Sequence, residues 1–247
     1  MPNNYLEKLK ENWNELATED ALWAILSDPE KKNNKWQLDE FFKTGEKEIL
    51  DILEKIKSLG LEINYGRCLD FGCGVGRLTQ SLGNFFQESI GVDISEKMIE
   101  LARSYNVKNN CYFFVSDNTD LSLFPDNYFD FIYSNITFQH IHPTYALLYI
   151  RSCLKKLASN GIMVFQVTTK EKVNIKNYLK KRLPYLLKMC RTVKKIICKN
   201  PSSKIEMYII SPQEIERIIQ QEKADIISRI NQETDITISS LFFIKKI

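Results

Sequence analysis

Three closely spaced glycines and one aspartate form the segment of this chain that is best suited to hold a small ligand. The run CLDFGCGVGRLT, residues 68–79, leads from a short apolar stretch into a predicted helix through Gly72, Gly74 and Gly76. A loop without Cβ atoms lets a ligand approach the backbone, and the helix that follows turns its N–H groups toward that ligand. The spacing is GxGxG, and Arg77 stands where a dinucleotide fingerprint has its last glycine. Asp70 precedes the loop, and its carboxylate would repel a pyrophosphate but suits a ligand that carries an ammonium group.

Two further acids follow the next apolar stretches. Asp93 ends the second stretch, 17 residues after Gly76 (93 − 76), and an acid there can accept hydrogen bonds from both hydroxyls of a ribose. Asp117 follows the third stretch, and together with the amide of Asn118 it suits the exocyclic amine of adenine. The three acids fall at the carboxyl ends of successive predicted strands, where open α/β sheets bind their ligands. S-adenosylmethionine combines an adenosine with such an ammonium group.

Alternating apolar runs and amphipathic helices must position these residues. The apolar runs cover residues 67–71, 89–93, 112–115, 129–135 and 162–167, and helices are expected at 77–86, 96–105 and 145–157. This alternation predicts a doubly wound α/β fold, in which a mostly parallel sheet carries helices on both faces. The pair Asn160-Gly161 is expected to form the turn before the fifth strand.

The two ends of the chain depart from this alternation. Residues 1–60 are expected to form an N-terminal helical cap, with its longest helix at about 38–59, and residues 61–247 form the core. A capping box and a proline predict a helix at 214–221, and two closing strands are expected at 224–230 and 241–245. A basic helical insertion, at about 170–210, is expected to precede these last two strands.

Three motifs resemble the class I (Rossmann-like) superfamily of S-adenosylmethionine-dependent methyltransferases. They are LDFGCGVG (69–76), GVDIS (91–95) and FDFIYS (129–134), and the similarity covers roughly residues 65–167. The resemblance implies a seven-stranded sheet with an antiparallel last strand, and S-adenosylmethionine as the cofactor. It also implies that Asp70 and the glycines hold the methionine part, Asp93 the ribose and Asp117 the adenine. The full predicted set of cofactor-binding residues is Asp70, Phe71, Gly72, Cys73, Gly74, Gly76, Arg77, Asp93, Ile94, Met98, Asp117, Asn118, Asn135 and Trp36.

His140, in the run NITFQHI after the fourth strand, is the predicted catalytic residue. In many members of the superfamily a histidine at this place faces the methyl acceptor. Methyl transfer from a sulfonium mainly needs proximity and alignment, but a hydroxyl acceptor also needs a base with a pKa near neutrality. The alternative is a structural histidine that bonds a backbone carbonyl. Trp36, with Phe41 and Phe42, is expected to form part of a lid near the cofactor, and packing within the helical cap is the alternative for these three residues.

The predicted function is transfer of a methyl group to an oxygen or a nitrogen of a small molecule. The acceptor is expected between the N-terminal helices and the insertion at 170–210. One alternative is an RNA or protein methyltransferase. RNA amino-methylating enzymes commonly carry an Asn/Asp-Pro-Pro-Tyr/Phe signature after the fourth strand, and the run NITF, 135–138, lacks both prolines. Another alternative is a cofactor-binding partner subunit without catalytic activity.

Composition narrows the remaining classes of protein. The net charge of +3 is too small to argue for nucleic acid, and none is expected as a partner. Six cysteines without a CxxC pair and only two histidines argue against a metal site and favour reduced thiols in a cytoplasmic protein. The stretch 170–200 has 11 Lys and Arg against one acid, a net of +10 (11 − 1). A peripheral contact with an anionic membrane, an acidic acceptor and a solvated helix face all remain open for it.

Overall fold

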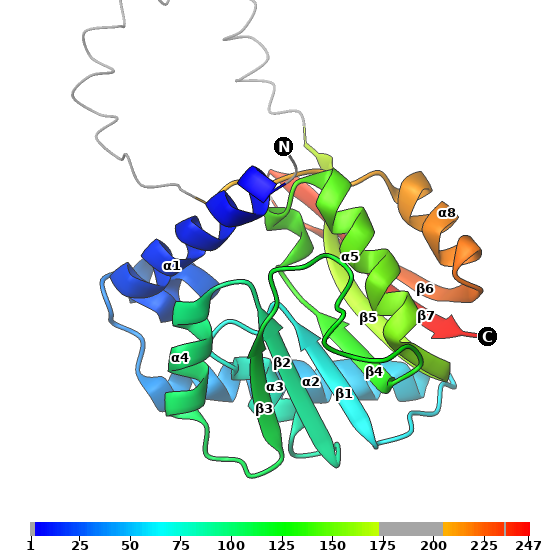
Figure 1. The fold of residues 1–247 in the computed structure, drawn as a ribbon, viewed down its shortest axis with the longest axis horizontal. Helices are drawn as coiled ribbons and strands as arrows, with labels where there is room; N and C mark the ends of the chain where they lie inside the picture. The colour runs from blue at the N-terminus through cyan, green and yellow to red at the C-terminus, as the bar shows by residue number, and fades with distance from the viewer. Residues whose placement is uncertain (1–2, 173–204, 235) are drawn as a thin grey trace, which may run out of the picture.

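A computed structural model describes residues 3–172, 205–234 and 236–247 (Figure 1). Most of the basic insertion expected from the sequence falls on residues 173–204, outside the described residues. In the described flanks of that insertion, residues 170 and 171 end a strand, and 205–210 form a connection without helix. No helix in the described part of the chain is both long enough and apolar enough to cross a membrane.

The N-terminal region is helical, as its apolar spacing predicts. The helices are α1 (Asn3–Ile25), η1 (Pro29–Lys31) and α2 (Leu38–Ser58). Asp20 has φ −164° and ψ 79°, so it interrupts α1 and separates its last turn. The Asp20 carboxylate accepts hydrogen bonds from the backbone N–H groups of Trp23 at 3.3 Å and Asn34 at 2.8 Å. It therefore acts as an N-cap for that turn, satisfying a donor that helix geometry leaves free.

The core is one seven-stranded sheet with the order β3-β2-β1-β4-β5-β7-β6. Neighbouring strands are parallel from β3 to β5, and β7 is antiparallel to both β5 and β6. This confirms the doubly wound, mostly parallel sheet expected from the sequence. The strands are β1 (Arg67–Phe71), β2 (Glu88–Asp93), β3 (Cys111–Val115), β4 (Phe129–Ser134), β5 (Leu157–Glu171), β6 (Ala224–Glu233) and β7 (Thr237–Lys246).

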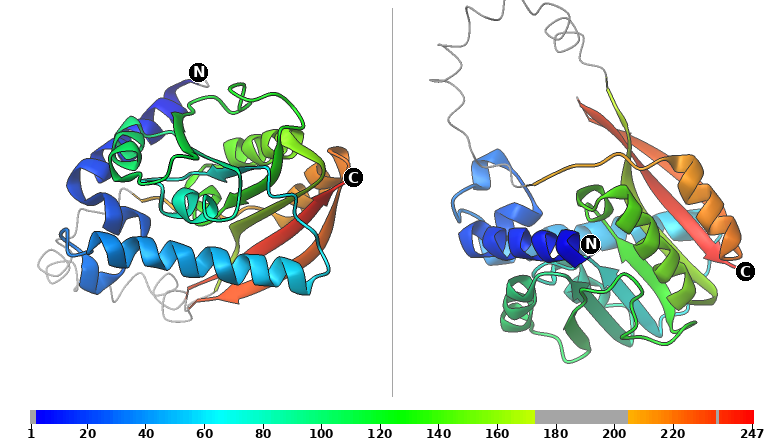
Figure 2. Two further views of the ribbon diagram at one scale, coloured as in Figure 1. Left: turned by 90° about the horizontal axis from the view of Figure 1, so that it is seen from below. Right: turned by 45° about the horizontal axis from the view of Figure 1, so that its top comes forward.

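Helices cover both faces of the sheet. The remaining helices among the described residues are α3 (Arg77–Leu82), α4 (Glu96–Tyr105), η2 (Phe138–His140), α5 (Pro143–Lys156) and α8 (Pro212–Gln221). The long helix α2 runs along one face together with α3 (Figure 2), and its Ile49, Ile52 and Ile56 pack against apolar side chains of that face. Helices α5 and α8 cover the opposite face and bury the largest apolar cluster of the chain's described part. Alternation along each strand supplies both cores, because successive side chains point to opposite faces.

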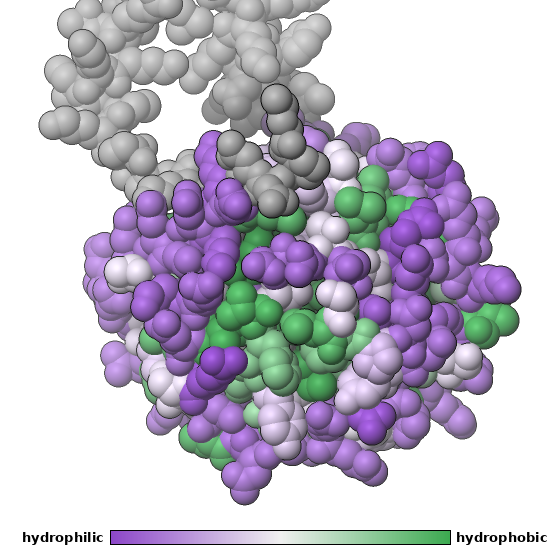
Figure 3. All heavy atoms as spheres, in the orientation of Figure 1, coloured by the Kyte–Doolittle hydropathy of each residue, from purple (hydrophilic) through white to green (hydrophobic). Residues whose placement is uncertain are grey.

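Near β3 this second face carries a loop, residues 116–128, in place of a helix. Tyr112 and Phe114 point to that side and stay 45% and 39% exposed. Figure 3, drawn in the orientation of Figure 1, shows hydrophobic residues gathered near the centre of the molecular surface.

The end of α3 and the start of β5 are among the predicted boundaries that differ from the structure. Helix α3 ends at Leu82, whereas the sequence pattern extended it to residue 86. The side chain of Asn110 donates to the carbonyls of Gly83 and Phe86 at 2.9 and 3.0 Å, so a side chain from before β3 satisfies the carbonyls that a longer helix would use. The expected turn at Asn160-Gly161 is an irregularity inside β5: Asn160 has φ 62°, and the pairing register with β4 shifts there.

Candidate functional site: a cavity at the strand ends

A largely apolar cavity, here named the strand-end cavity, opens at the carboxyl ends of β1, β2 and β4. Eight residues predicted from the sequence line it, namely Phe71, Gly72, Gly74, Asp93, Ile94, Met98, Asn135 and His140. Its other lining residues are Leu9, Trp13, Ala24, Ile25, Val92, Ser116, Ile136, Thr137, Ile141 and Tyr149. The strand order brings these residues together, because β1 lies between β2 and β4.

The glycine loop adopts a backbone that other residues rarely take. Gly72, Gly74 and Gly76 have φ of 78°, 52° and 83°, all in the left-handed region. The Gly72 and Cys73 N–H groups donate to the Val92 carbonyl at 2.8 and 3.0 Å, which ties the loop to β2. A Cβ on Gly74 would lie 2.6 Å from Cδ1 of Ile25, on the cavity side. The loop backbone is therefore part of the cavity wall.

Gly76 has a different reason to be glycine. A Cβ at this position would lie 2.6 Å from the ring of Phe113 on β3. Gly76 does not line the strand-end cavity, so the structure ties this glycine to close packing of α3 against the sheet. Cys73, also predicted to contact the cofactor, is buried beneath the loop and does not line the cavity.

Asp93 joins the glycine loop to the end of β2. Its Oδ2 accepts a hydrogen bond from the Gly74 N–H, and its Oδ1 accepts one from the Ser95 N–H, both at 2.9 Å. Burial raises the pKa of this carboxyl, and the backbone donors at residues 74, 94 and 95 oppose that shift. Each carboxylate oxygen has further acceptor capacity. Asp93 can therefore hold the loop and still accept hydroxyl donors from a ligand.

Asp70 lies beneath the glycine loop. It is 1% exposed, and its Oδ2 accepts a hydrogen bond from the Thr79 hydroxyl at 2.6 Å. Its Oδ1 is buried without a partner among the described residues. Burial raises the pKa of Asp70 to about 7, while the Thr79 hydrogen bond and the Arg77 charge act in the opposite direction. Asp70 does not line the strand-end cavity, because alternation along β1 turns its side chain toward Thr79 of α3.

Four other predicted residues lie away from the cavity lining. Arg77 is 3% exposed and forms an ion pair with Glu48 on α2 at 2.8 Å. Trp36 packs edge-on against Phe41 and donates its indole N–H to the Leu26 carbonyl at 3.1 Å, so this side of the helical cap is packed within itself. The remaining two, Asp117 and Asn118, are exposed in the loop after β3, where Ser116 alone reaches the cavity.

His140 lies between the strand-end cavity and a second cavity. Its Nδ1 is 2.7 Å from the Glu206 carbonyl oxygen, and its Nε2 is 3.1 Å from Nε2 of Gln139. Because Oε1 of Gln139 accepts from Gln166 and Thr168, the Gln139 amide must donate to His140. This arrangement corresponds to a neutral imidazole with its proton on Nδ1. Burial lowers the pKa of His140, and the Glu206 carbonyl opposes the shift.

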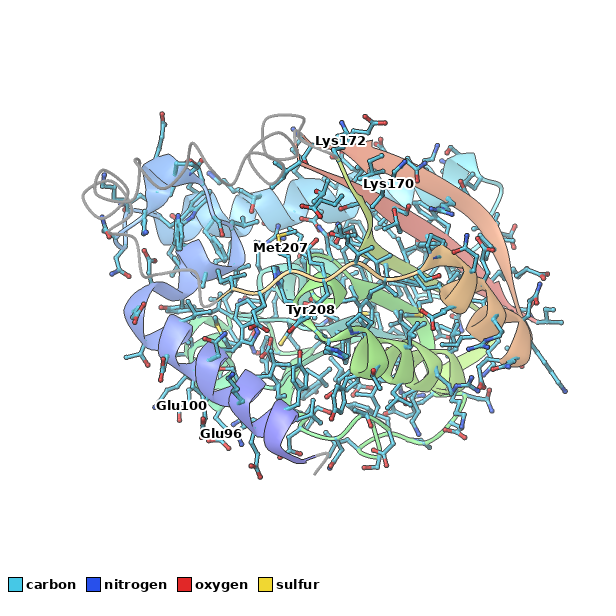
Figure 4. All side chains as sticks on the ribbon, turned by 90° about the horizontal axis from the view of Figure 1, so that it is seen from above. Glu96, Glu100, Lys170, Lys172, Met207 and Tyr208 are labelled. Atoms are coloured by element: carbon cyan, nitrogen blue, oxygen red, sulfur yellow. The ribbon has the colours of Figure 1, made fainter. Side chains whose placement is uncertain are left out.

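The second cavity, here named the side cavity, lies between α1 and the connection that leads into α8. Figure 4 shows Tyr208 on that connection. The side cavity shares Leu9, Trp13 and His140 with the strand-end cavity. Its other lining residues are Tyr5, Lys8, Asn12, His142, Ile205, Glu206 and Tyr208. It is therefore more polar than its neighbour, with aromatic rings and charges of both signs.

Comparison with known proteins relates the part of the chain that forms this site to a protein family. Residues 69–165, which include the glycine loop, Asp93 and His140, match the model of the methyltransferase domain family. A methyltransferase domain of this family therefore occupies residues 69–165, within a Rossmann-like fold. Its fold is similar to that of the magnesium protoporphyrin IX methyltransferase of Synechocystis PCC 6803, with a TM-score of 0.62 and 16% identity over 97% of this chain and 98% of the other.

Curated relatives match only part of this chain. A malonyl-[acyl-carrier protein] O-methyltransferase of Bacillus anthracis is 32% identical over 107 residues, which are 42% of this chain and 38% of the relative. A phosphoethanolamine N-methyltransferase of Triticum aestivum is 35% identical over 103 residues, which are 38% of this chain and 19% of the relative. The chain thus spans less than two fifths of the length of the curated relatives it matches.

Sequence reasoning missed several cavity residues of the methyltransferase fold. Trp13 and Ile25 of α1 and Tyr149 of α5 line the strand-end cavity, although their spacing marks them only as apolar helix positions. Thr137 lies against the glycine loop, with its side chain in the space that a Cβ of Gly72 would occupy. Thr137 could have been predicted, because it is a polar residue shortly after the fourth strand, where ligand-binding residues are expected. No comparable signal distinguishes Trp13 from Trp36.

Proposed function

We propose that the protein binds S-adenosylmethionine in the strand-end cavity and transfers its methyl group to an oxygen or a nitrogen of a small-molecule acceptor. The contact between Asp93 and Gly74 carries the proposal. It couples an acid that suits ribose hydroxyls to a left-handed glycine loop that a ligand can approach, and both line one cavity. The apolar remainder of the wall suits an adenine ring and a thioether.

Residues at the ends of three strands would then each hold a different part of the cofactor. Asp93 would hold the ribose, and Ile94, Met98 and Ser116 would border the adenine. The backbone at Gly72 and Gly74 would receive the methionine part, with Asp70 supplying negative charge from below the loop. The cofactor supplies an activated methyl group on a sulfonium. Catalysis by this chain would consist mainly of alignment and of excluding water from an apolar cavity.

The side cavity is the proposed position of the acceptor. It adjoins the strand-end cavity at His140, so a molecule seated there could extend a reactive atom toward the methyl group. It also lies between α1 and the described end of the 170–210 segment, where the sequence pattern predicts the acceptor. The names of the curated relatives include an O-methyltransferase and an N-methyltransferase, which supports both atom types. Membrane contact through residues 170–200 stays a prediction from the sequence.

His140 is proposed as the general base for a hydroxyl acceptor. Its lowered pKa supports this role, because the neutral imidazole is the form that takes a proton. Its Nε2 lone pair faces Gln139, so the acceptor hydroxyl would have to replace the Gln139 amide there. The same contacts also suit a purely structural histidine, and kinetics distinguish the two roles.

The experiment has two stages. Isothermal titration calorimetry with S-adenosylhomocysteine tests the cofactor site, and we expect a 1:1 complex with a micromolar dissociation constant. Transfer of tritiated methyl from S-adenosylmethionine to cell extract fractions then tests catalysis, with labelled small molecules as the expected product. Absence of binding would refute the cofactor site. Binding without transfer to any fraction would favour the non-catalytic partner subunit, and label in RNA or protein would favour the other alternative.

A further inference from the structure

Three donors converge on one carboxylate outside the strand-end cavity. Glu48 of α2 accepts the Arg77 guanidinium on Oε2 at 2.8 Å. Its Oε1 accepts the Tyr133 hydroxyl at 2.9 Å and Nδ2 of Asn135 at 2.7 Å. The Glu48 side chain is 22% exposed and that of Arg77 only 4%, so the ion pair is largely removed from water. Such a cluster holds its members in one arrangement, because each broken bond would leave a poorly solvated polar group.

This arrangement decides which way the Asn135 amide points. A carboxylate oxygen accepts hydrogen bonds and cannot donate them, so the atom of Asn135 that faces Glu48 must be the nitrogen. The Asn135 Oδ1 is thereby directed away from Glu48. It has no hydrogen-bond partner within the described residues, yet it is absent from the buried unsatisfied atoms, so it is open to solvent.

Asn135 separates two cavities. On one side is a cavity lined by Thr44, Glu48 and Tyr133, and Nδ2 of Asn135 bonds this Glu48. On the other side is the strand-end cavity, which Asn135 also lines. With Nδ2 held by Glu48, Oδ1 is the polar side-chain atom of Asn135 left for a ligand, and the strand-end cavity is one of the two cavities that Asn135 lines.

The strand order indicates which ligand meets this oxygen. Asp93 on β2 and the glycine loop on β1 are the proposed sites for the ribose and the methionine part. β4 is the next strand in the sheet, and Asn135 directly follows it. In S-adenosylmethionine the sulfonium sulfur joins the ribose part to the methionine part, so its methyl group lies between the proposed sites at β2 and β1. Asn135 and His140 line the same cavity, so an acceptor that reaches this methyl group can also contact Asn135.

We propose that Glu48 is a positioning residue that fixes Asn135 with its carbonyl oxygen toward the strand-end cavity, where it accepts a hydrogen bond from an N–H or O–H of the methyl acceptor. This inference rests on the proposed function. The acceptor class is then an amine, alcohol or phenol. An ionised carboxylate acceptor is disfavoured, because its oxygens have no hydrogen to donate and would oppose Oδ1.

The transfer needs no proton uptake by Asn135. The lone pair of the acceptor nitrogen or oxygen forms the new bond to the methyl carbon. The bond between that carbon and sulfur breaks, and its electron pair goes to sulfur. The hydrogen held by Asn135 orients the lone pair toward the methyl group. An amine then releases a proton to solvent or to His140. A hydroxyl has a single hydrogen, so it donates either to Asn135 or to His140, and when it donates to Asn135 its proton leaves to solvent. Asn135 and Glu48 therefore affect alignment and acceptor choice.

Glu48→Gln tests the proposal because it reverses the amide of Asn135. In this variant the side-chain oxygen at position 48 stays with Arg77, since the guanidinium only donates, and the new NH2 group faces Tyr133 and Asn135. Asn135 must then turn its oxygen toward that NH2 group and its own NH2 toward the cavity. We expect a drop of about 10- to 100-fold in kcat/KM with amine and phenol probes, measured by S-adenosylhomocysteine release. The dissociation constant of S-adenosylhomocysteine should stay within about threefold.

Two further variants isolate the amide orientation. Glu46→Gln makes the same chemical change on the same helix at an exposed position, and it should keep kcat/KM close to the wild-type value. Asn135→Asp in the Glu48→Gln background should restore much of the lost activity, because the new carboxylate accepts from the amide at position 48 and again presents an oxygen to the cavity. A purely structural role for Glu48 would not give this rescue.

The Asn135 side-chain amide gives a readout that needs no acceptor. With ¹⁵N-labelled asparagine, Glu48→Gln should shift its NH2 signals as they lose the carboxylate partner, while Glu46→Gln should not. Unchanged signals, absence of rescue in the double variant, or carboxylates as the best acceptor probes would each overturn the inference. A large loss of S-adenosylhomocysteine affinity in Glu48→Gln would also overturn it, because Oδ1 would then serve the cofactor. Failure of wild-type protein to bind S-adenosylhomocysteine would refute the proposed function, and the amide signals would still test the orientation.

Discussion

Replacing Asp93 with alanine tests the proposed cofactor site at the residue that connects the glycine loop to the start of α4. The carboxylate accepts one backbone N–H from the glycine loop and one from the start of α4, each at 2.9 Å. In the proposed complex it also accepts both ribose hydroxyls. Asp93→Ala therefore removes two hydrogen bonds within the protein and two to the ligand.

The size of the effect follows from these bonds. Hydrogen bonds to a charged group contribute about 1.5–3 kcal/mol each, and some of this is regained by water. A loss of about 2–4 kcal/mol in binding raises the dissociation constant about 30- to 1000-fold. The two backbone donors left unpaired lower the free energy of unfolding by a further ~1–3 kcal/mol each. Asp93→Asn keeps one acceptor oxygen and should fall between the alanine variant and the wild type in both quantities.

The assay is calorimetry with S-adenosylhomocysteine, together with urea unfolding to establish that each variant is folded at the titration temperature. Asp117→Ala removes an exposed acid after the neighbouring strand, and we expect its dissociation constant to rise less than about tenfold. Burial raises the pKa of Asp93, so wild-type affinity should weaken as pH falls and the carboxylate gains its proton. Asp93→Asn should lack that pH dependence. A folded Asp93→Ala variant with wild-type affinity would refute the assignment of this residue to the ribose.

Four further predictions use the same structure. Gly74→Val combines a left-handed φ of 52° with a side chain directed at Ile25, so we expect loss of S-adenosylhomocysteine binding with retained circular dichroism; unchanged binding would show that the ligand does not approach this backbone. Trp13→Phe should abolish the change in tryptophan fluorescence on S-adenosylhomocysteine binding, whereas Trp36→Phe should preserve it, since Trp13 lines the strand-end cavity and Trp36 does not. Asp70 has its pKa raised from 3.8 to about 7, so the folded state keeps a proton that the unfolded state releases, and the free energy of unfolding should fall by up to about 4 kcal/mol as pH rises from 4 to 7; urea unfolding of Asp70→Asn should show a flatter profile over that range. With a hydroxyl acceptor, His140→Ala should lower kcat by about 10²- to 10⁴-fold with S-adenosylhomocysteine affinity little changed, and near-full turnover would leave His140 as the structural link to Glu206.

The sequence alone determined the features that depend on neighbouring residues. Runs of apolar residues mark all five parallel strands, and a helix follows Ser211 as predicted. It begins at Pro212, two residues before the predicted start, and the Ser211 side chain does not form the predicted capping hydrogen bond. Gly72 and Gly74 were recognisable because a left-handed turn between a strand and a helix strongly favours glycine. The end of β2 could be located from the same pattern, and with it Asp93. These signals are local, since backbone conformation and alternation are decided within a few residues.

Only the tertiary structure decided which side chains share the cavity. Trp13 and Trp36 have the same type of sequence signal, yet α1 carries the first into the cavity wall and the helical cap packs the second against Phe41. Arg77 has the right sequence position for a cofactor contact, but α3 turns it toward Glu48, 29 residues earlier in the chain. The orientation of Asn135 depends on that same glutamate. Helix phase and the packing of α2 against the sheet set these partners, and both are decided by contacts between residues far apart in the chain, which no local pattern contains.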